Sequence, residues 1–262
     1  MSVAWLAEAR DDGALAARVG RDGDRMVAEW PQRARLSVKR DGSDVVFEPH
    51  PDAERVDVEK LRRGAVGLLL AHLRGAIPLH ASAVAVDGRA AIFIGGTGLG
   101  KSTLAACVCD LAGASLLGDD AVSVERIGDQ FVVVALEDQH WLDAPAAHAL
   151  GRRGDFGDAK IGVPSLRSDV KQAPVALLVH LAFTEVDAPR IVPVLGLEAV
   201  AGLLEQLTRF VVDEPQVARR DLASLADLVD QTPVVRLERP RQLTLLRPTA
   251  ELIAAALLGE QP

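Results

Sequence analysis

The alternation of apolar and polar residues predicts short strands near the start of the chain. The first twenty or so residues are rich in alanine and charge without a clear period, so we expect a surface helix or a loosely held start there. Strands are then predicted at 26–30, 34–39 and 45–48. Asp41-Gly42 between the last two is a strong hairpin signal. The pattern therefore predicts a small antiparallel unit.

A helix is predicted after these strands. Apolar residues recur at helical spacing from Val58 to His72, with Asp57 as the expected N-cap and Gly75 at the end. We interpret His72, on the apolar face, as a core-edge histidine rather than a ligand. Strands and helix together predict a small N-terminal α+β unit over residues 1–75, fused to a larger α/β unit over residues 76–262.

The larger unit alternates between apolar runs of strand length and amphipathic stretches. Apolar runs at 79–86 and 89–94, joined by Asp87-Gly88, predict an antiparallel hairpin whose second strand leads into a glycine-rich loop. In a doubly wound parallel sheet that strand would be reached from a crossover helix, so the hairpin favours a mixed sheet. Further strands are predicted at 115–118, 121–126, 130–136, 175–183, 191–194 and 234–237, and helices at 101–111, 197–210, around 222–228 and at 250–258.

The glycine-rich loop carries the strongest functional signal. It comprises Gly95, Gly96, Thr97, Gly98, Leu99, Gly100, Lys101 and Ser102. Repeated glycines let consecutive backbone N–H groups surround phosphate oxygens, and the helix that begins there adds the positive end of its dipole. Lys101 would reach the terminal phosphates of a nucleotide, and Ser102 would hold magnesium. The alternative, a glycine-rich turn that binds nothing, is disfavoured because the predicted strand and helix on either side match the motif.

Two adjacent carboxylates follow the strand predicted at 115–118. A helical crossover from Lys101 would return this strand as a parallel neighbour of the strand at 89–94, so Asp119 and Asp120 would lie beside the phosphates. One carboxylate would hold the metal, directly or through water, and the other would accept the proton of an attacking hydroxyl. The alternative is a solvated Asp-Asp turn that opens the next hairpin, which we disfavour because of the neighbouring loop.

Two later stretches are polar without a decisive pattern. Residues 137–143 include Trp141 and would either line a substrate or nucleotide or form a loop anchored by that tryptophan. Residues 151–171 are rich in glycine and charge and would form either a plain surface loop or a lid. In a lid, Lys160 or an arginine would meet phosphate oxygens. His180, in a later apolar strand, is interpreted as buried and structural.

Composition narrows the class of protein. With 262 residues, 49% hydrophobic and 25% charged, the chain is long enough for a sizeable core. A net charge of -8 argues against a nucleic-acid partner. No apolar run approaches the roughly 18 residues needed to span a bilayer, and acidic residues near the start spoil a signal-peptide interpretation, so we expect a cytoplasmic protein without a membrane partner. We expect Cys107 and Cys109 to be packed thiols rather than a disulfide or a metal site.

Four motifs together resemble HPr kinase/phosphorylase and the wider group of HPr-kinase-like proteins. They are Leu-His-Ala-Ser at 79–82, the hairpin through Asp87-Gly88, the loop at 95–102, and Leu-Gly-Asp-Asp at 117–120. The resemblance covers residues 79–121. It implies a P-loop kinase core with the phosphoenolpyruvate-carboxykinase-like fold, the use of ATP and Mg²⁺, and transfer of phosphate from ATP to a serine hydroxyl on a protein.

The resemblance also implies roles for individual residues. His80 matches the family's active-site histidine, Lys101 its phosphate-binding lysine and Ser102 its magnesium-binding serine. Asp120, allowing one inserted residue, matches the aspartate that accepts the substrate's proton. Asp119 would be its neighbour and a metal ligand, and the one-residue offset leaves the choice of base between the two aspartates open.

The chain departs from the family pattern at three places. Ser102 is followed by Thr103, as in the divergent kinase-like branch, where the family usually has glutamate. The family has a second segment with a metal-binding glutamate, for which Glu137 is the nearest candidate here. A later family loop ends in Gly-Arg-Asn, whereas the corresponding residues 193–198 lack the arginine. Because that loop serves the reverse, phosphate-removing reaction, the resemblance implies a kinase without phosphorylase activity.

We therefore expect an ATP-dependent kinase that acts on a serine of a protein or peptide, with His80, Lys101, Asp119 and Asp120 as catalytic residues. One alternative is a small-molecule kinase that uses the same residues. Another is a non-catalytic module whose loop at 151–171 orders when nucleotide binds, which ranks last because the acidic pair is intact. HPr kinases form hexamers, and the sequence leaves open whether this chain forms a homo-oligomer.

Overall fold

The computed structural model describes residues 3–152 and 160–259. The chain forms two compact units, one of residues 1–76 with 209–221 and one of residues 77–208 with 222–262. The smaller unit thus includes the segment 209–221, which the sequence pattern placed with the larger unit. Ion pairs hold this segment within its unit, because Arg21 lies 2.7 Å from Asp213 and 2.6 Å from Glu214.

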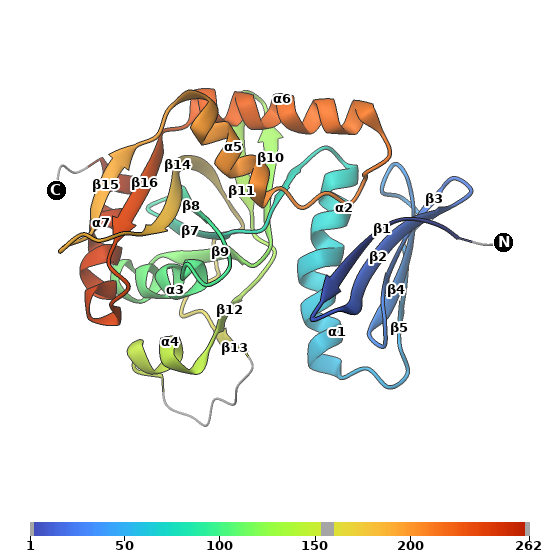
Figure 1. The fold of residues 1–262 in the computed structure, drawn as a ribbon, viewed down its shortest axis with the longest axis horizontal. Coiled ribbons are helices and arrows are strands. Elements are labelled where there is room, and N and C mark those ends of the chain that lie inside the picture. The colour runs from blue at the N-terminus through green and yellow to red at the C-terminus, as the bar shows by residue number, and fades with distance from the viewer. Residues whose placement is uncertain (1–2, 153–159, 260–262) are drawn as a thin grey trace. The chain divides into compact units, whose positions relative to one another are not determined.

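The smaller unit contains an antiparallel sheet in which neighbouring strands follow chain order (Figure 1). Its strands are β1 (Ala4–Asp11), β2 (Ala14–Asp22), β3 (Arg25–Trp30), β4 (Ala34–Lys39) and β5 (Val46–Pro49). The expectation of a helix or loose start over the first twenty residues is wrong. Asp12 and Gly13 have φ of 45° and 82°, so they form a tight turn between β1 and β2. Most of β1 is exposed and most of β2 is only half-buried, which is why no apolar period marks them.

The helical part of the smaller unit is continuous but changes its winding. It consists of α1 (Arg55–Leu61), a π-helical turn η1 (Arg62–Val66) and α2 (Gly67–Leu73). The N-cap is Glu54 rather than Asp57, which lies in the first turn. His72 is fully buried, and its Nε2 lies 3.0 Å from Oδ2 of Asp221 in the same unit. This contact with a carboxylate agrees with a structural role for the histidine.

The larger unit is a mixed α/β structure built on a mixed sheet, as the hairpin at 79–94 predicted. Its strands are β6 (Ile77–Leu79), β7 (Ser82–Val86), β8 (Arg89–Ile94), β9 (Ser115–Asp119), β10 (Val122–Ile127), β11 (Gln130–Val134), β14 (Gln172–Phe183), β15 (Arg190–Pro193) and β16 (Val234–Arg239). The long strand β14 pairs in parallel with β8 and β16, and its first residues pair antiparallel with β11. The sheet therefore branches at β14.

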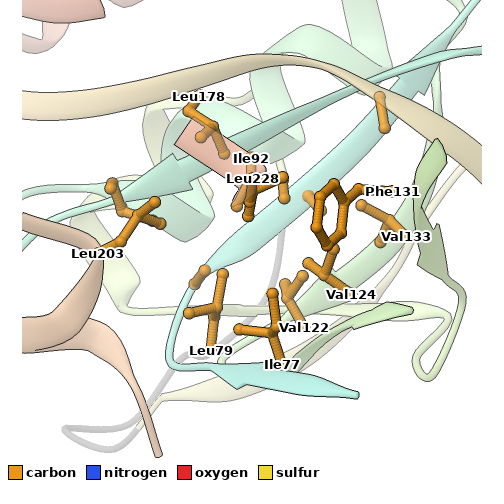
Figure 2. Close-up of a cluster of buried hydrophobic side chains, with 14 of the residues drawn as sticks. Ile77, Leu79, Ile92, Val122, Val124, Phe131, Val133, Leu178, Leu203 and Leu228 are labelled. Carbon is orange, nitrogen blue, oxygen red and sulfur yellow. The ribbon is translucent and has the colours of Figure 1, made fainter. Parts of the chain in front are cut away.

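Helices cover both faces of this sheet. Successive residues of a strand point to opposite faces, so one strand supplies apolar side chains to the helices on each side. On β8, Ile92 and Ile94 join a cluster with Leu203 of α5 (Gly196–Gln206) and Leu228 of α6 (Pro215–Gln231), shown in Figure 2. Phe93 joins the opposite cluster, with residues of α3 (Lys101–Ala112) and α7 (Leu246–Leu258). Figure 1 shows the two pairs of helices on either side of the sheet. This packing fixes the end of β8, from which the glycine-rich loop leaves.

Other differences concern pairing and boundaries. The expectation that the strand after α3 pairs with β8 is wrong, because β7 lies between β8 and β9 and is antiparallel to both. The strand β12 (Gln139–Leu142) pairs with β13 (Ile161–Pro164), and α4 (Ala144–Ala149) and a 3-10 turn η2 (Leu243–Leu245) complete the unit. Within the described residues, no helix is long and apolar enough to cross a membrane.

Candidate functional site

The glycine-rich loop joins β8 to α3. Its glycines adopt backbone conformations that other residues rarely reach, with φ of 144° at Gly95, 81° at Gly98 and 77° at Gly100. Gly100 is the N-cap of α3, which begins at Lys101. The first N–H groups of a helix have no partner within the helix, and the helix dipole makes this end positive. The loop and helix start thus present N–H donors suited to an anion.

Lys101 lies inside this loop. Its side chain is buried, and its Nζ donates to the carbonyl oxygen of Gly95 at 2.7 Å. Burial lowers the pKa of the ammonium, whereas the carboxylates of Asp120 and Asp119 act in the opposite direction. An ammonium held in the loop by a backbone carbonyl is well placed to contact an anion that enters it.

Asp119 ends β9 and lies behind the loop. The pairing of β9 with β7 sets it opposite Ser82, whose hydroxyl donates to it at 2.5 Å, and the backbone N–H of Trp141 donates to its other oxygen at 2.7 Å. The hydroxyl of Ser102 lies near enough to this carboxylate to help lower its pKa. Burial raises the pKa of Asp119 to about 6 despite these donors. A buried carboxylate beside the Ser102 hydroxyl is an oxygen ligand set of the kind that Mg²⁺ prefers.

Asp120 has a strained backbone at the opening of the site. Its φ is 64°, a left-handed conformation that costs a non-glycine residue roughly 1 kcal/mol. Its neighbour His80, placed by a hydrogen bond of 2.8 Å from its backbone N–H to the carbonyl of Gln206, lines the same cavity. The pKa of His80 is lowered, first because protein excludes water from its ring and second because the Lys101 ammonium repels an imidazolium. The lowered pKa favours the neutral imidazole, which lines the same cavity as the Asp120 carboxylate.

A cavity of about 480 Å³ brings most of the predicted residues together. Its lining includes His80, Asp120 and the residues from Thr97 to Thr103 other than Leu99. Asp119 is not part of the lining, and the carbonyl of Gly95, also outside it, holds Lys101. Gly96 is also outside the lining. Among the described residues, no group of three or more histidine, cysteine or acidic side chains forms a ready metal cluster.

Two stretches left open by the sequence contribute to this region. Trp141 lines the cavity, and its indole Nε1 donates to Glu137 at 3.2 Å. Glu137 is buried, and burial together with the nearby Asp119 carboxylate raises its pKa to about 8. Lys160 also lines the cavity, while residues 153–159 of the loop at 151–171 lie outside the described residues. The rest of that loop includes the strand β13.

Several residues of the cavity lining were not predicted from the sequence. Among them are Phe183 at the end of β14, Arg239 at the end of β16, and Arg241 just beyond it. The guanidinium carbons of Arg239 and Arg241 lie 4.8 and 5.5 Å from the centre of the Phe183 ring. The only local signal was the arginine-rich run from 236 to 241, directly after an apolar strand.

The cysteines and His180 are separate from this chemistry. Cys107 and Cys109 are buried free thiols on α3, as expected, and burial raises their pKa values to about 11 and about 12. His180 is partly buried and packs against Gly202 of α5, where an added Cβ would lie 1.9 Å from its ring.

Comparison with known proteins finds similarity among solved structures but not among family models or curated sequences. No protein-family model matches the chain, and no curated protein matches it in sequence. Among solved structures, the chain is similar to the HPr(Ser) kinase/phosphatase from Coxiella burnetii, with a TM-score of 0.40 and 17% sequence identity. That similarity covers 70% of this chain and 97% of the other.

Proposed function

We propose that this protein is an ATP-dependent kinase that transfers the γ-phosphate of ATP to a hydroxyl, that of a serine in a protein or peptide. One observation carries the proposal: a buried lysine ammonium, a serine hydroxyl near a buried carboxylate, a second aspartate and a histidine gather at one cavity, at the N-terminus of α3. Phosphoryl transfer needs chiefly positioning and charge stabilisation, which such a set can supply.

The residues that would hold Mg²⁺ are Ser102 and Asp119. They fit the ion because both offer oxygen atoms, and because the Asp119 carboxylate, with a pKa of about 6, is largely ionised at neutral pH. When bound, Mg²⁺ would offset charge on the phosphate oxygens. The N–H groups of the loop and the Lys101 ammonium would hold the phosphates from the other side.

Asp120 is proposed as the general base. The acceptor oxygen forms a bond to the γ-phosphorus, the bond from that phosphorus to the ADP oxygen breaks, and the hydroxyl proton passes to the Asp120 carboxylate. His80, whose lowered pKa favours the neutral form, lines the same cavity as Asp120 and would orient the acceptor by a hydrogen bond. The choice of serine as acceptor is supported by the sequence resemblance at residues 79–121 alone.

The test follows label from [γ-³²P]ATP and Mg²⁺ into serine-containing proteins and peptides encoded beside the gene, and into a panel of small hydroxyl compounds. We expect wild-type protein to label a serine and Lys101→Ala to lose about 100-fold or more of the rate. Asp129→Asn, an exposed change in the turn between β10 and β11, serves as the matched control and should leave the rate unchanged.

Each result has a distinct meaning. Label that enters only small compounds replaces the serine acceptor with a small-molecule acceptor. Tight ATP binding without transfer to any acceptor would contradict the kinase and favour a nucleotide-dependent binding module. Equal rates for wild type and Lys101→Ala would place the chemistry outside this cavity.

A further inference from the structure

Arg239 is a cation built into the wall of the glycine-rich loop. It is the last residue of β16, its side chain is 7% exposed, and it lines the cavity. Its Nη2 donates to the carbonyl oxygen of Leu99 at 2.6 Å. A Cβ added at Gly100 would lie 2.9 Å from the same nitrogen. The guanidinium therefore lies directly against the N-cap of α3, where the loop presents its N–H donors.

The charge of Arg239 lacks a counter-ion within the described part of the chain. Arg236, three residues earlier on the same strand, pairs with Glu198 and Glu238 at 2.7 and 3.1 Å. For Arg239 no ion pair with any described carboxylate is present, and its buried Nε has no hydrogen-bond partner there. Burial alone lowers its pKa to about 10. A buried cation without a counter-ion is costly, so such residues normally meet an anion.

The neighbours of Arg239 favour a phosphate as that anion. The guanidinium lies over the Phe183 ring, with its carbon 4.8 Å from the ring centre. The ring contacts the flat face of the guanidinium, and the Leu99 carbonyl accepts a hydrogen bond from its edge. A planar fork of N–H donors matches phosphate oxygens in pairs, which a lysine ammonium does not. The loop next to it offers backbone N–H groups to the same kind of ligand.

We propose that Arg239 binds a phosphate group of the ligand in this cavity and so acts as a second fixed cation beside Lys101. The identity of the ligand as a nucleotide rests on the proposed function above. The binding of an anion by Arg239 does not, because it follows from the buried unpaired guanidinium and the loop against which it lies. The alternative role is structural, in which Arg239 only fixes the Leu99 carbonyl.

Equilibrium binding of ATP, pyrophosphate and adenosine to the full chain separates these roles. Arg239→Gln keeps a polar side chain with N–H donors but loses the charge, whereas Arg239→Lys keeps the charge. We expect Arg239→Gln to weaken ATP and pyrophosphate about 10- to 100-fold, Arg239→Lys to weaken them less, and adenosine to change less than about twofold. Arg236→Gln is the matched control, and thermal unfolding of each variant checks its fold.

Several results would overturn the inference. They are equal losses for Arg239→Gln and Arg239→Lys, a loss for adenosine as large as that for ATP, unchanged binding of pyrophosphate, or wild-type protein that binds neither phosphate ligand. The failure of the kinase proposal looks different. If pyrophosphate binding depends on Arg239 but no phosphate is ever transferred from ATP, the anion site stands and the kinase does not. If phosphate is transferred and Arg239→Gln binds ATP and pyrophosphate as wild type does, the kinase proposal stands and the anion site at Arg239 does not.

Discussion

Replacing Glu137 with glutamine should change how the stability of the protein depends on pH. The Glu137 carboxyl is 8% exposed, lies near the Asp119 carboxylate, and accepts a hydrogen bond from the Trp141 indole at 3.2 Å. Burial and the nearby negative charge raise its pKa from the ordinary 4.5 to about 8. The folded protein therefore keeps a proton on Glu137 at neutral pH, whereas the unfolded chain releases it.

The size of the effect follows from this difference in pKa. Because the neutral acid is favoured in the fold, the contribution of Glu137 is fully present below pH 4.5 and is lost as the pH rises from 4.5 to about 8. Each pH unit in that interval is worth about 1.4 kcal/mol, so the loss between pH 4.5 and pH 7 is about 3 kcal/mol. Glutamine cannot ionise. The stability of Glu137→Gln relative to wild type should therefore rise by this amount over the interval.

The measurement is urea unfolding at steps of pH from 4.5 to 7.5, followed by pulsed hydrogen exchange of peptides from β8 and β14, which report the larger unit. Glutamine also changes the hydrogen bonds of the site, but that cost is the same at every pH and leaves the slope intact. Glu185→Gln, an exposed change, is the matched control and should follow wild type at every pH. A difference between Glu137→Gln and wild type that stays constant with pH would refute the reasoning.

Three further predictions concern the loop, the core and the thiols. Gly100→Ala should destabilise the protein by about 1 kcal/mol, because φ is 77°, and weaken ATP binding by about tenfold or more, because the new Cβ meets the buried Arg239 guanidinium. Unchanged ATP binding would contradict this prediction. Leu178→Ala, in the core, should lower the free energy of unfolding in urea by about 2–5 kcal/mol. Leu195→Ala, at a residue that is 80% exposed, should change it by less than about 0.5 kcal/mol, and similar losses for both variants would contradict this prediction. At pH 8 a thiol reagent should react with Cys107 and Cys109 only after unfolding, because their pKa values are about 11 and about 12; rapid labelling of native protein would disprove it.

Local patterns predicted the elements around the loop well, because those elements carry strong local signals. The run from 89 to 94 is buried on both faces, and Asp87-Gly88 has φ of 48° and 74°, as a two-residue hairpin turn requires. The same dipeptide at Asp12-Gly13 makes an equivalent turn, but its flanking strands are exposed or half-buried and show no apolar period. Turn chemistry would thus have been a better guide there than periodicity.

Long-range pairing was beyond the sequence pattern. The insertion of β7 between β8 and β9 is decided by which strands pack best across the whole sheet, and no local spacing encodes it. Arg239 reaches the loop in the same way, because the parallel pairing of β16 with β14 brings it to a carbonyl 140 residues away. The cavity lining could therefore be predicted where its residues are close in sequence, from 80 to 120, and not where strand order brings distant residues such as Arg239 to it.

Substitution of Asp120 by asparagine tests the central proposal most directly. Asparagine has the same shape and tolerates the left-handed backbone that this position requires, so the turn and the loop should persist. The measurement is the affinity for ATP with Mg²⁺ and the rate of γ-phosphate transfer, on one preparation each of wild type and Asp120→Asn. The kinase proposal predicts ATP affinity within about threefold of wild type and transfer reduced about 100-fold or more. Transfer at the wild-type rate by Asp120→Asn would contradict the role of this aspartate as the general base and, with it, the proposed mechanism.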